Sequence, residues 1–182
     1  MKKFLLLAMT LLMALSLVAG CGSDSPKKMV IGLDDNFAPM GFRNEKNEIV
    51  GYDIDLAKEA CKRAGMEVEF KPIDWASKET ELNSGKIDAI WNGFTMTPER
   101  QKKLGFTKPY MDNTQVYVVL ADSPIKTQAE LKGKKLDIQE ASTAEAALNK
   151  DPALKNSFSE VKAYPDLASA EECGCGNCSH RR

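Results

Sequence analysis

The sequence has almost no histidine, no excess of either charge and no apolar run as long as a membrane-spanning helix. Its 182 residues include one histidine, His180, so a site with several histidine ligands is excluded and Ser-His-Asp or Cys-His catalysis would depend on that residue alone. The 25 Lys and Arg residues balance 26 Asp and Glu, which gives a net charge of -1. This balance argues against a nucleic acid or an anionic membrane surface as the main partner, because both attract an excess of basic residues.

The remaining composition is typical of a folded globular protein. Hydrophobic residues make up 43% of the chain and charged residues 28%, which excludes disorder over the whole length. The chain has room for one domain or for two small ones. We find no internal repeat and no low-complexity segment.

The first 28 residues have the pattern of an export signal followed by a tether. Lys2 and Lys3 precede an apolar run over residues 4–19, and small residues then lead to Cys21. This pattern predicts a signal peptide over residues 1–20 and lipidation of the Cys21 thiol. The alternative is a short transmembrane anchor, but the run is shorter than the roughly 20 residues that a spanning helix needs. Residues 21–28 are polar, and we expect a tether there.

From Met29 onward, apolar periodicity predicts an alternation of strands and helices. The expected strands cover residues 29–33, 49–52, 66–70, 87–91, 115–120, 136–139 and 160–164. The expected helices cover residues 53–64, 78–83, 98–103 and 143–149, with a last helix from Pro165. This order predicts an α/β fold, in which helices cover a sheet. Ligands of such sheets bind beyond the carboxyl ends of the strands, which directs attention to the loops at 34–39 and 92–97.

Three helix ends carry capping signals. Gly65 suits the position that follows a helix, where a left-handed backbone is common. Thr97 is expected to cap a helix that starts at Pro98. Ser142 and Glu145 have the spacing of a capping box at the start of another helix.

One candidate binding group centres on Arg100, which follows a Gly-Phe-Thr loop. A guanidinium offers two parallel donors that match a carboxylate, and Thr95 adds a hydroxyl and a backbone N–H nearby. Gly93 allows a close approach of the backbone carbonyl. Together these residues could hold both ends of an α-amino acid. The alternative is that Arg100 is one of several solvated charges in the segment 98–103.

A second candidate group consists of Asp34, Phe37 and Trp75. The two rings could form the walls of a pocket, and Asp34 could bind a polar or cationic group inside it. The alternative is that both rings belong to the hydrophobic core. The residues alone leave the choice open.

Five motifs, taken in order, resemble the polar amino-acid solute-binding proteins of ABC transporters. They are Asp34–Met40, Gly51–Ala57, Ile73–Trp75, Asn92–Arg100 and Phe106–Tyr110. The resemblance implies a two-lobed periplasmic-binding-protein-like α/β fold, with lobes at 29–118 and 119–172, that closes on a polar amino acid. It implies no catalytic residue, no cofactor, an ABC permease as partner, and a place in the cell envelope outside the cytoplasm.

The same resemblance assigns roles to single residues. Arg100 and Thr95 would bind the α-carboxylate, Gly93 and Thr95 the ammonium, and Asp34, Phe37 and Trp75 the side chain. In the second lobe, the N–H groups around Ser142 and Thr143 would meet the carboxylate at a helix N-terminus, and Gln139 would face the side chain. The family usually has glycine where this chain has Asp137 and Ala141, and alanine is unfavourable if a positive φ is needed at 141.

Residues 173–182 depart from the family, which usually continues further. Cys173, Cys175, Cys178 and His180 lie close together, but their spacing is not a common zinc pattern. A shift of the reading frame by one base would allow a small, apolar strand here, so we expect an out-of-frame tail and an incomplete second lobe. We further expect weak or absent binding from this chain by itself, since the family's carboxylate partner for the ammonium lies beyond this point.

Alternatives to amino-acid transport remain open on the sequence alone. A dehydratase-type enzyme on the same fold would need a general acid or base, and Glu140 is the one unexpected carboxylate near the predicted site. A metal-binding lipoprotein would use the cysteine-rich tail, and a sensor input domain would need a signalling module. Cys61 falls on the apolar face of its helix and is expected to be packed rather than reactive. Glutamine, histidine, arginine, lysine and cystine all suit the predicted side-chain pocket.

Overall fold

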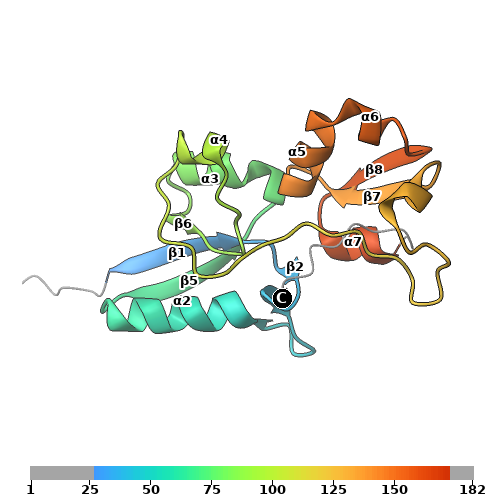
Figure 1. Ribbon diagram of the computed structural model, residues 1–182. Coiled ribbons are helices and arrows are strands. Elements are labelled where there is room, and N and C mark those ends of the chain that lie inside the picture. The colour runs from blue at the N-terminus through green and yellow to red at the C-terminus, as the bar shows by residue number, and fades with distance from the viewer. Residues whose placement is uncertain (1–26, 173–182) are drawn as a thin grey trace, which may run out of the picture.

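The computed structural model describes residues 27–172 and arranges them in two α/β regions that lie side by side (Figure 1). The first region runs from β1 to α4, and the second from a short 3-10 helix at Gln128–Leu131 to α7. The segment at 102–127 contains no helix or strand and crosses from one region to the other. The fold is therefore mixed α/β, as predicted.

The first region is built on a parallel sheet of three strands. β1 (Lys28–Leu33) lies in the centre, between β5 (Glu67–Pro72) and β6 (Ala89–Ile90). Parallel pairing follows from the helical connections between these strands, which carry the chain back to the same end of the sheet. The strands predicted at 29–33 and 66–70 are confirmed. The strand predicted at 87–91 is shorter, because only two of its residues pair with β1.

Helices cover both faces of this sheet (Figure 1). α2 (Tyr52–Arg63) packs Ala57 and Cys61 against Ile31 of β1, and the buried Cys61 is packed as predicted. α2 ends at Ala64, and Gly65 follows with a φ of 65°. α3 (Lys78–Asn83) has the predicted bounds, whereas α4 (Pro98–Gln101) ends before the predicted Lys103.

An antiparallel hairpin sheet joins the end of β1 to α2. It consists of β2 (Asn36–Phe37), β3 (Gly41–Arg43) and β4 (Ile49–Val50), so the loop predicted at 34–39 contains a strand. Gly51 closes the hairpin with a φ of 135°, and a Cβ there would lie 2.4 Å from the Met40 carbonyl oxygen. Only glycine fits this backbone, which fixes the start of α2 against the hairpin.

The second region has a smaller parallel sheet and its own core. β7 (Lys135–Gln139) pairs with β8 (Glu160–Tyr164). Around them lie α5 (Thr143–Lys150), α6 (Pro152–Lys155) and α7 (Leu167–Glu172), which starts two residues after the predicted Pro165. The core residues belong to a cluster separate from that of the first region; they are Leu131, Leu136, Ile138, Ala144, Leu148 and Phe158.

The strand predicted at residues 115–120 is wrong. The segment has high β propensity, but in the structure it runs over the second region without pairing with a strand. A strand needs a neighbour for its N–H and C=O groups, and propensity alone does not supply one. The Leu120 side chain is 65% exposed, which is consistent with this open position.

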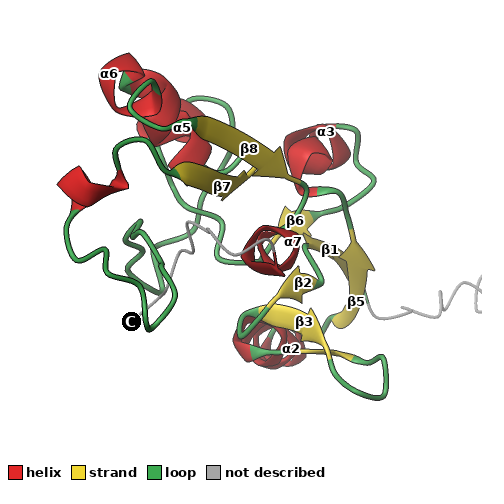
Figure 2. Ribbon diagram, turned by 90° about the vertical axis from the view of Figure 1, so that its right-hand side faces the viewer, coloured by secondary structure: helices red, strands yellow, loops and turns green. Residues whose placement is uncertain are grey.

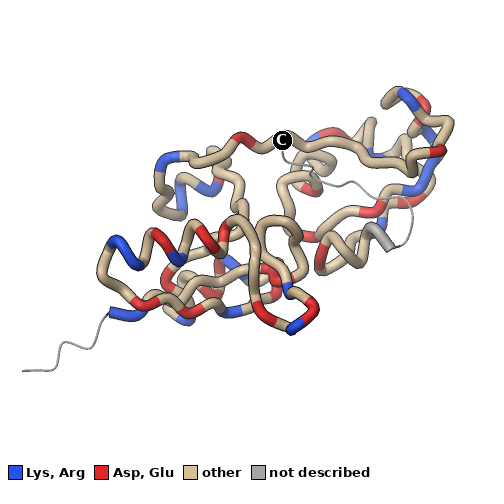
Figure 3. The backbone as a smooth tube through the Cα atoms, turned by 90° about the horizontal axis from the view of Figure 1, so that it is seen from below, with Lys and Arg blue, Asp and Glu red and all other residues tan. Residues whose placement is uncertain are grey.

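The two regions contact each other at several points besides the crossing segment. α7 lies between β7 and β2 (Figure 2), and the Asn36 side-chain amide donates to Asp166 Oδ1 at 2.9 Å. On the other side, Lys150 Nζ of α5 lies 2.8 Å from Glu99 Oε1 of α4. Basic and acidic residues alternate along the described chain without a long run of one sign (Figure 3).

Candidate functional site

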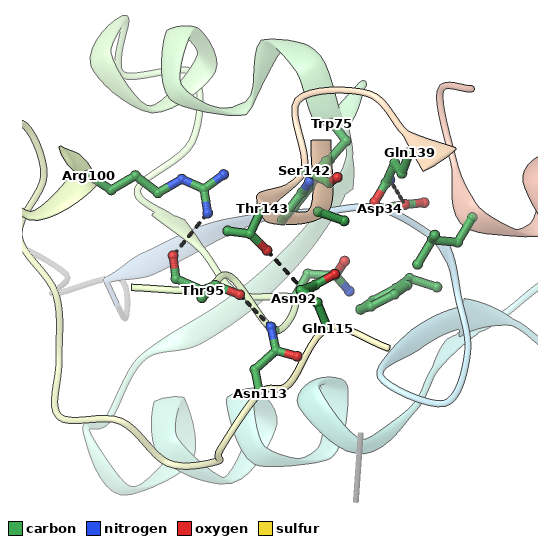
Figure 4. A pocket seen from close by; sticks show the side chains of 14 residues that line it. Asp34, Trp75, Asn92, Thr95, Arg100, Asn113, Gln115, Gln139, Ser142 and Thr143 are labelled. Atoms are coloured by element: carbon green, nitrogen blue, oxygen red, sulfur yellow. Dashed lines mark hydrogen bonds between the residues drawn. The ribbon is translucent and has the colours of Figure 1, made fainter. Parts of the chain in front are cut away.

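A small cavity of about 40 Å³ lies where the two regions meet (Figure 4). The first region contributes the loops that follow β1 and β6 and the helix α4, and the second contributes the end of β7 and the start of α5. The crossing segment and α7 complete the wall. The lining residues are Asp34, Phe37, Trp75, Asn92, Gly93, Thr95, Arg100, Asn113, Gln115, Gln139, Ser142, Thr143, Ala144 and Leu167.

All nine residues that the sequence predicts as ligand-binding line this one cavity. Six come from the first region and three from the second, which places segments 105 residues apart in contact. The cavity lies beyond the carboxyl ends of β1, β6 and β7, where an α/β sheet usually presents its site. Contact of these residues with a ligand stays a prediction.

Arg100 points toward the cavity and is held on several sides. Its Nη1 donates to the Thr95 carbonyl at 3.0 Å, its Nε lies 3.6 Å from Glu79 Oε1, and its guanidinium carbon lies 4.3 Å from the Phe94 ring centroid. Only 13% of its side chain is exposed, so it is not one of the solvated charges of its helix. Burial lowers the pKa of Arg100, but a guanidinium remains a cation at neutral pH.

The loop before α4 holds Thr95 and Gly93 at the cavity. Asn113 of the crossing segment donates from Nδ2 to Thr95 Oγ1 at 2.6 Å, which fixes the orientation of this hydroxyl. Gly93 has a φ of 56°, a left-handed backbone that favours glycine. As predicted, Thr97 caps α4, and its Oγ1 accepts from the Arg100 N–H at 3.2 Å. The cap fixes the helix turn from which the Arg100 side chain extends.

The two aromatic residues are walls of the cavity, and Trp75 also belongs to the core. The Trp75 ring packs edge-on against Phe94, with 5.8 Å between the ring centroids, and is buried. Phe94 in turn stacks on Phe106 at 5.5 Å. Phe37 is half-buried in β2, beyond the loop that follows β1, and lines the same cavity. Trp75 therefore serves both of the roles that the sequence left open, whereas Phe37 is a wall of the cavity.

Asp34 is a buried carboxylate that bridges the two regions. Its Oδ1 accepts from the Asn36 N–H at 2.9 Å, and its Oδ2 accepts from Gln139 Nε2 at 2.9 Å. Burial raises the pKa of Asp34, and the nearby carboxylates of Asp166 and Asp35 act in the same direction. The hydrogen bonds from Asn36 and Gln139 oppose this shift. An anion in this position favours donors, preferably cationic ones, as neighbours.

In the second region, the start of α5 faces the cavity. Ser142 is the N-cap, and its Oγ accepts from the Glu145 N–H at 3.1 Å. The capping box is only half as predicted, because the Glu145 carboxylate accepts from the N–H of Ala141 instead of Ser142. Ala141 has a φ of 52°, so this position does need the left-handed backbone that alanine adopts reluctantly. Asp137 is accommodated in β7 and is buried.

Sequence reasoning did not select five of the lining residues. They are Asn92, Asn113, Gln115, Ala144 and Leu167. Asn92 lies in a loop that was singled out, and its buried Nδ2 has no hydrogen-bond partner among the described residues. Gln115, which was predicted as part of a strand, donates to Thr143 Oγ1 at 3.2 Å. No local pattern marks Asn113 or Leu167, because only the crossing segment and the packing of α7 bring them to the cavity.

Comparisons with known proteins identify the family. The sequence model of the bacterial extracellular solute-binding proteins, family 3, matches residues 29–163. This chain belongs to that family. It is 36% identical over 151 residues to the arginine-binding extracellular protein ArtP of Bacillus subtilis, covering 80% of this chain and 58% of the relative. It is 37% identical over 158 residues to the histidine-binding periplasmic protein of Salmonella typhimurium, covering 85% and 60%.

The structure of this solute-binding protein also resembles solved structures. An ABC uptake transporter substrate-binding protein of Streptococcus pneumoniae, with bound histidine, superposes with a TM-score of 0.76 at 39% identity. That match covers 80% of this chain and 60% of the other. The chain thus spans about 60% of the length of the relatives that it matches. Its fold is the two-lobed fold of periplasmic binding proteins, with an incomplete second lobe.

Other predictions for this solute-binding protein fall partly outside the described residues. The signal peptide at 1–20, the lipidated Cys21 and the cysteine-rich tail at 173–182 are not among them. Within residues 27–172, no helix is both long and apolar enough to cross a membrane. The same range holds no group of three or more His, Cys, Asp or Glu side chains that could bind a metal ion. Glu140, the candidate acid or base, does not line the cavity.

Proposed function

We propose that this protein is the extracytoplasmic binding component of an amino-acid ABC importer. It binds a polar amino acid between its two lobes and delivers it to a membrane permease. The observation that carries the proposal is the composition of the cavity. A held guanidinium lies near a helix N-terminus, and a buried carboxylate and two aromatic rings also line the wall. Such a cavity offers complementary groups to both ends of an amino acid.

The α-carboxylate of the ligand is proposed to bind at Arg100. Its guanidinium can donate two parallel hydrogen bonds, and the Thr95 N–H adds a third donor. Across the cavity, the N–H groups at Ser142 and Thr143 belong to the first turn of α5, where the helix dipole favours an anion. These groups come from both lobes, so a bound carboxylate would hold the lobes together.

The α-ammonium is proposed to bind at the loop that follows β6. The Gly93 carbonyl and the Thr95 hydroxyl are acceptors, and both residues line the cavity. Asn113 donates to Thr95 Oγ1, which leaves a lone pair of this oxygen for the ligand.

The ligand side chain is proposed to lie between Phe37 and Trp75, with Asp34 and Gln139 at its end. Asp34 is an acceptor whose surroundings are already negative, so side chains with hydrogen-bond donors are favoured, and cationic ones most. Arginine and histidine, for which the two relatives above are named, both meet this requirement. Lysine and glutamine also meet it.

The membrane attachment is proposed from the sequence. A signal peptide at 1–20 would direct export, and acylation of Cys21 would anchor the protein to the membrane through the tether at 21–28. The names of the relatives, extracellular and periplasmic, support a location outside the cytoplasm. Incorporation of a labelled fatty acid, lost in Cys21→Ser, tests the anchor.

Isothermal titration of the chain with a panel of amino acids tests binding. We expect heat from L-arginine, L-histidine, L-lysine or L-glutamine, and none from L-aspartate, whose side-chain carboxylate would face Asp34. A matched titration with agmatine, which lacks the α-carboxylate of arginine, should show no binding. The proposal is wrong if the panel gives no signal at millimolar ligand, or if agmatine binds as well as arginine.

A further inference from the structure

Lys78, the first residue of α3, is a buried cation that the proposed ligand contacts do not use. Its side chain is 2% exposed, and Nζ donates to the Trp75 carbonyl at 2.8 Å. The same nitrogen lies 4.7 Å from the centroid of the Trp75 ring. Within the described residues, no carboxylate forms an ion pair with it. A buried ammonium without an anionic partner is costly, so its contacts indicate what it stabilises.

The other contact of Lys78 crosses to the second lobe. Nζ donates to the Ala141 carbonyl at 3.1 Å, and Arg100 Nη2 donates to the same oxygen at 3.4 Å. Two cations of the first lobe therefore converge on one carbonyl of the second. The Ala141 N–H is also occupied, since it donates to Glu145 Oε2 at 2.7 Å. Because its N–H and its carbonyl are both hydrogen-bonded and its φ is left-handed, Ala141 has little freedom to move.

The place of Ala141 in the chain gives this contact its importance. The residue lies between the end of β7 and Ser142, the N-cap of α5. A displacement of the Ala141 carbonyl would therefore displace Ser142 and Thr143, which line the cavity. Lys78 itself does not line the cavity, so its influence on the second lobe's side of the cavity passes through Ala141.

We propose that Lys78 is a positioning residue that ties the Ala141 carbonyl to the first lobe and so holds the start of α5 opposite Arg100. The effect of the tie on amino-acid affinity rests on the proposed function. The tie itself requires no ligand and can be measured without one. Lys78 has this role because an ammonium can donate to two carbonyls at once, whereas an apolar side chain of similar length can donate to none.

The surroundings of Lys78 also set the response of the tie to pH. Burial lowers the pKa of Lys78 to about 8, and the Arg100 cation acts in the same direction. Glu79, Asp74 and Glu145 oppose this shift. Because the pKa lies below its ordinary value of 10.5, the buried position favours the neutral amine, which still donates hydrogen bonds. A rise in pH from 8 to 10.5 therefore favours the tied arrangement over one in which Lys78 meets water.

Hydrogen exchange of the full chain without ligand tests the tie. The relevant amides are those of Ala141, Glu145 and Ala146, whose hydrogen bonds all lie at the start of α5. In Lys78→Met, we expect these amides to exchange about tenfold faster, while β1 keeps its protection. Lys78→Arg retains donors and should stay closer to the wild type. The control Lys86→Met removes an exposed lysine of the same lobe and should change nothing at these amides.

Unchanged exchange at the start of α5 in a folded Lys78→Met variant would overturn the proposal. A loss of protection across β1 in Lys78→Met and Lys78→Arg would also overturn it, because Lys78 would then stabilise the whole core of the first lobe. A second readout is the fluorescence of Trp75 in a Trp91→Phe background, which should titrate near pH 8 and lose this titration in Lys78→Met. If the exchange result holds while no amino acid binds the wild type, only the proposed function fails.

Discussion

The two lobes contribute different kinds of groups to the cavity that they share. The first lobe supplies long and charged side chains, namely Arg100 and Asp34, together with the rings of Phe37 and Trp75. The second lobe supplies neutral groups, namely the Gln139 amide at the end of β7 and the hydroxyl and main-chain groups at the start of α5. The charged groups and the aromatic walls of the cavity therefore come from one lobe, and the other lobe completes the lining with neutral polar groups.

The lobes also differ in how well they are packed. In the first lobe, Ile31, Leu33 and Ile54 have no exposed surface, and helices cover both faces of a three-stranded sheet. In the second lobe, the sheet has two strands among the described residues, and most core side chains keep a small exposed fraction. We therefore expect the second lobe to open at a lower free-energy cost than the first.

The largest expected effect separates the contributions of the two lobes to ligand binding. Arg100→Met removes the cation and leaves the ligand carboxylate unpaired, so we expect affinity to fall about 100-fold or more. Thr143→Val keeps the shape of the side chain but removes one hydroxyl of the second lobe. We expect it to reduce ligand affinity about tenfold or less. Isothermal titration with the best ligand of the panel measures both.

Arg63→Met is the control for this comparison, because Arg63 is an exposed arginine of α2. It should leave affinity unchanged. Equal losses in Arg100→Met and Thr143→Val would contradict the division of roles between the lobes.

The next effect concerns the backbone of each lobe. Gly51→Ala forces a Cβ against the Met40 carbonyl at a φ of 135°, and we expect it to reduce the free energy of unfolding by about 2 to 4 kcal/mol. Gly133→Ala in the second lobe meets no atom within 4 Å, so only its φ of 75° is unfavourable, at a cost of about 1 kcal/mol. Urea unfolding measures both, and Gly105→Ala, at an open position, is the control.

A smaller effect of opposite sign is expected at Ala141. Replacement by glycine relieves the left-handed φ, and after the entropy of the unfolded chain is counted we expect a gain of about 0.5 kcal/mol. Ala146→Gly lies within α5 on its exposed side and should cost about 1 kcal/mol. Thermal unfolding compares the two variants. A loss of stability in Ala141→Gly would show that alanine is not strained there.

The smallest effect is expected at the ion pair between the lobes, Glu99 and Lys150. The hydrogen bond from Lys150 lowers the pKa of Glu99 to about 2, so the pair stabilises the contact above the ordinary pKa of 4.5 and loses this effect as pH falls toward 2. Both side chains are exposed, which keeps the effect small. Glu99→Gln should reduce the pH dependence of Ala146 exchange between pH 5 and 3. Glu59→Gln, whose partner lies within α2, should not.

Much of the fold follows from local patterns in the sequence. The bounds of α3, the glycine after α2 and the Thr97 cap depend on residues close together in the chain, and all three were predicted correctly. The strand predicted at 115–120 was wrong, because a strand depends on a partner that is distant in the chain and that propensity does not reveal. The hairpin at β2 and β3 was missed because its strands are two or three residues long.

The candidate site also combines residues that the sequence predicts with residues that only the fold reveals. Six of the lining residues were first put forward from the chemistry of their side chains and loops, and the family resemblance then favoured them over the alternatives. Gln139, Ser142 and Thr143 were selected from the resemblance alone, and the fold brings all nine to one cavity. Lys78 was not selected, since a lysine at a helix start is usually solvated, and only the structure shows that it is buried and contacts Ala141. Asn113 was missed for a similar reason, because its contact with Thr95 depends on the path of the crossing segment.

The bridge between Gln139 and Asp34 has a consequence for ligand selection. Gln139 Nε2 occupies one lone pair of Asp34 Oδ2, so a ligand donor at this oxygen either shares the carboxylate with a neutral amide or displaces that amide. Where the amide is displaced, the gain on binding would be the difference between two hydrogen bonds, which is near zero for another neutral amide and favourable for a charged donor. We therefore expect Gln139 to compete with the neutral donors of a ligand, so that guanidinium, imidazolium and ammonium groups would bind at Asp34 more favourably than the amide of glutamine.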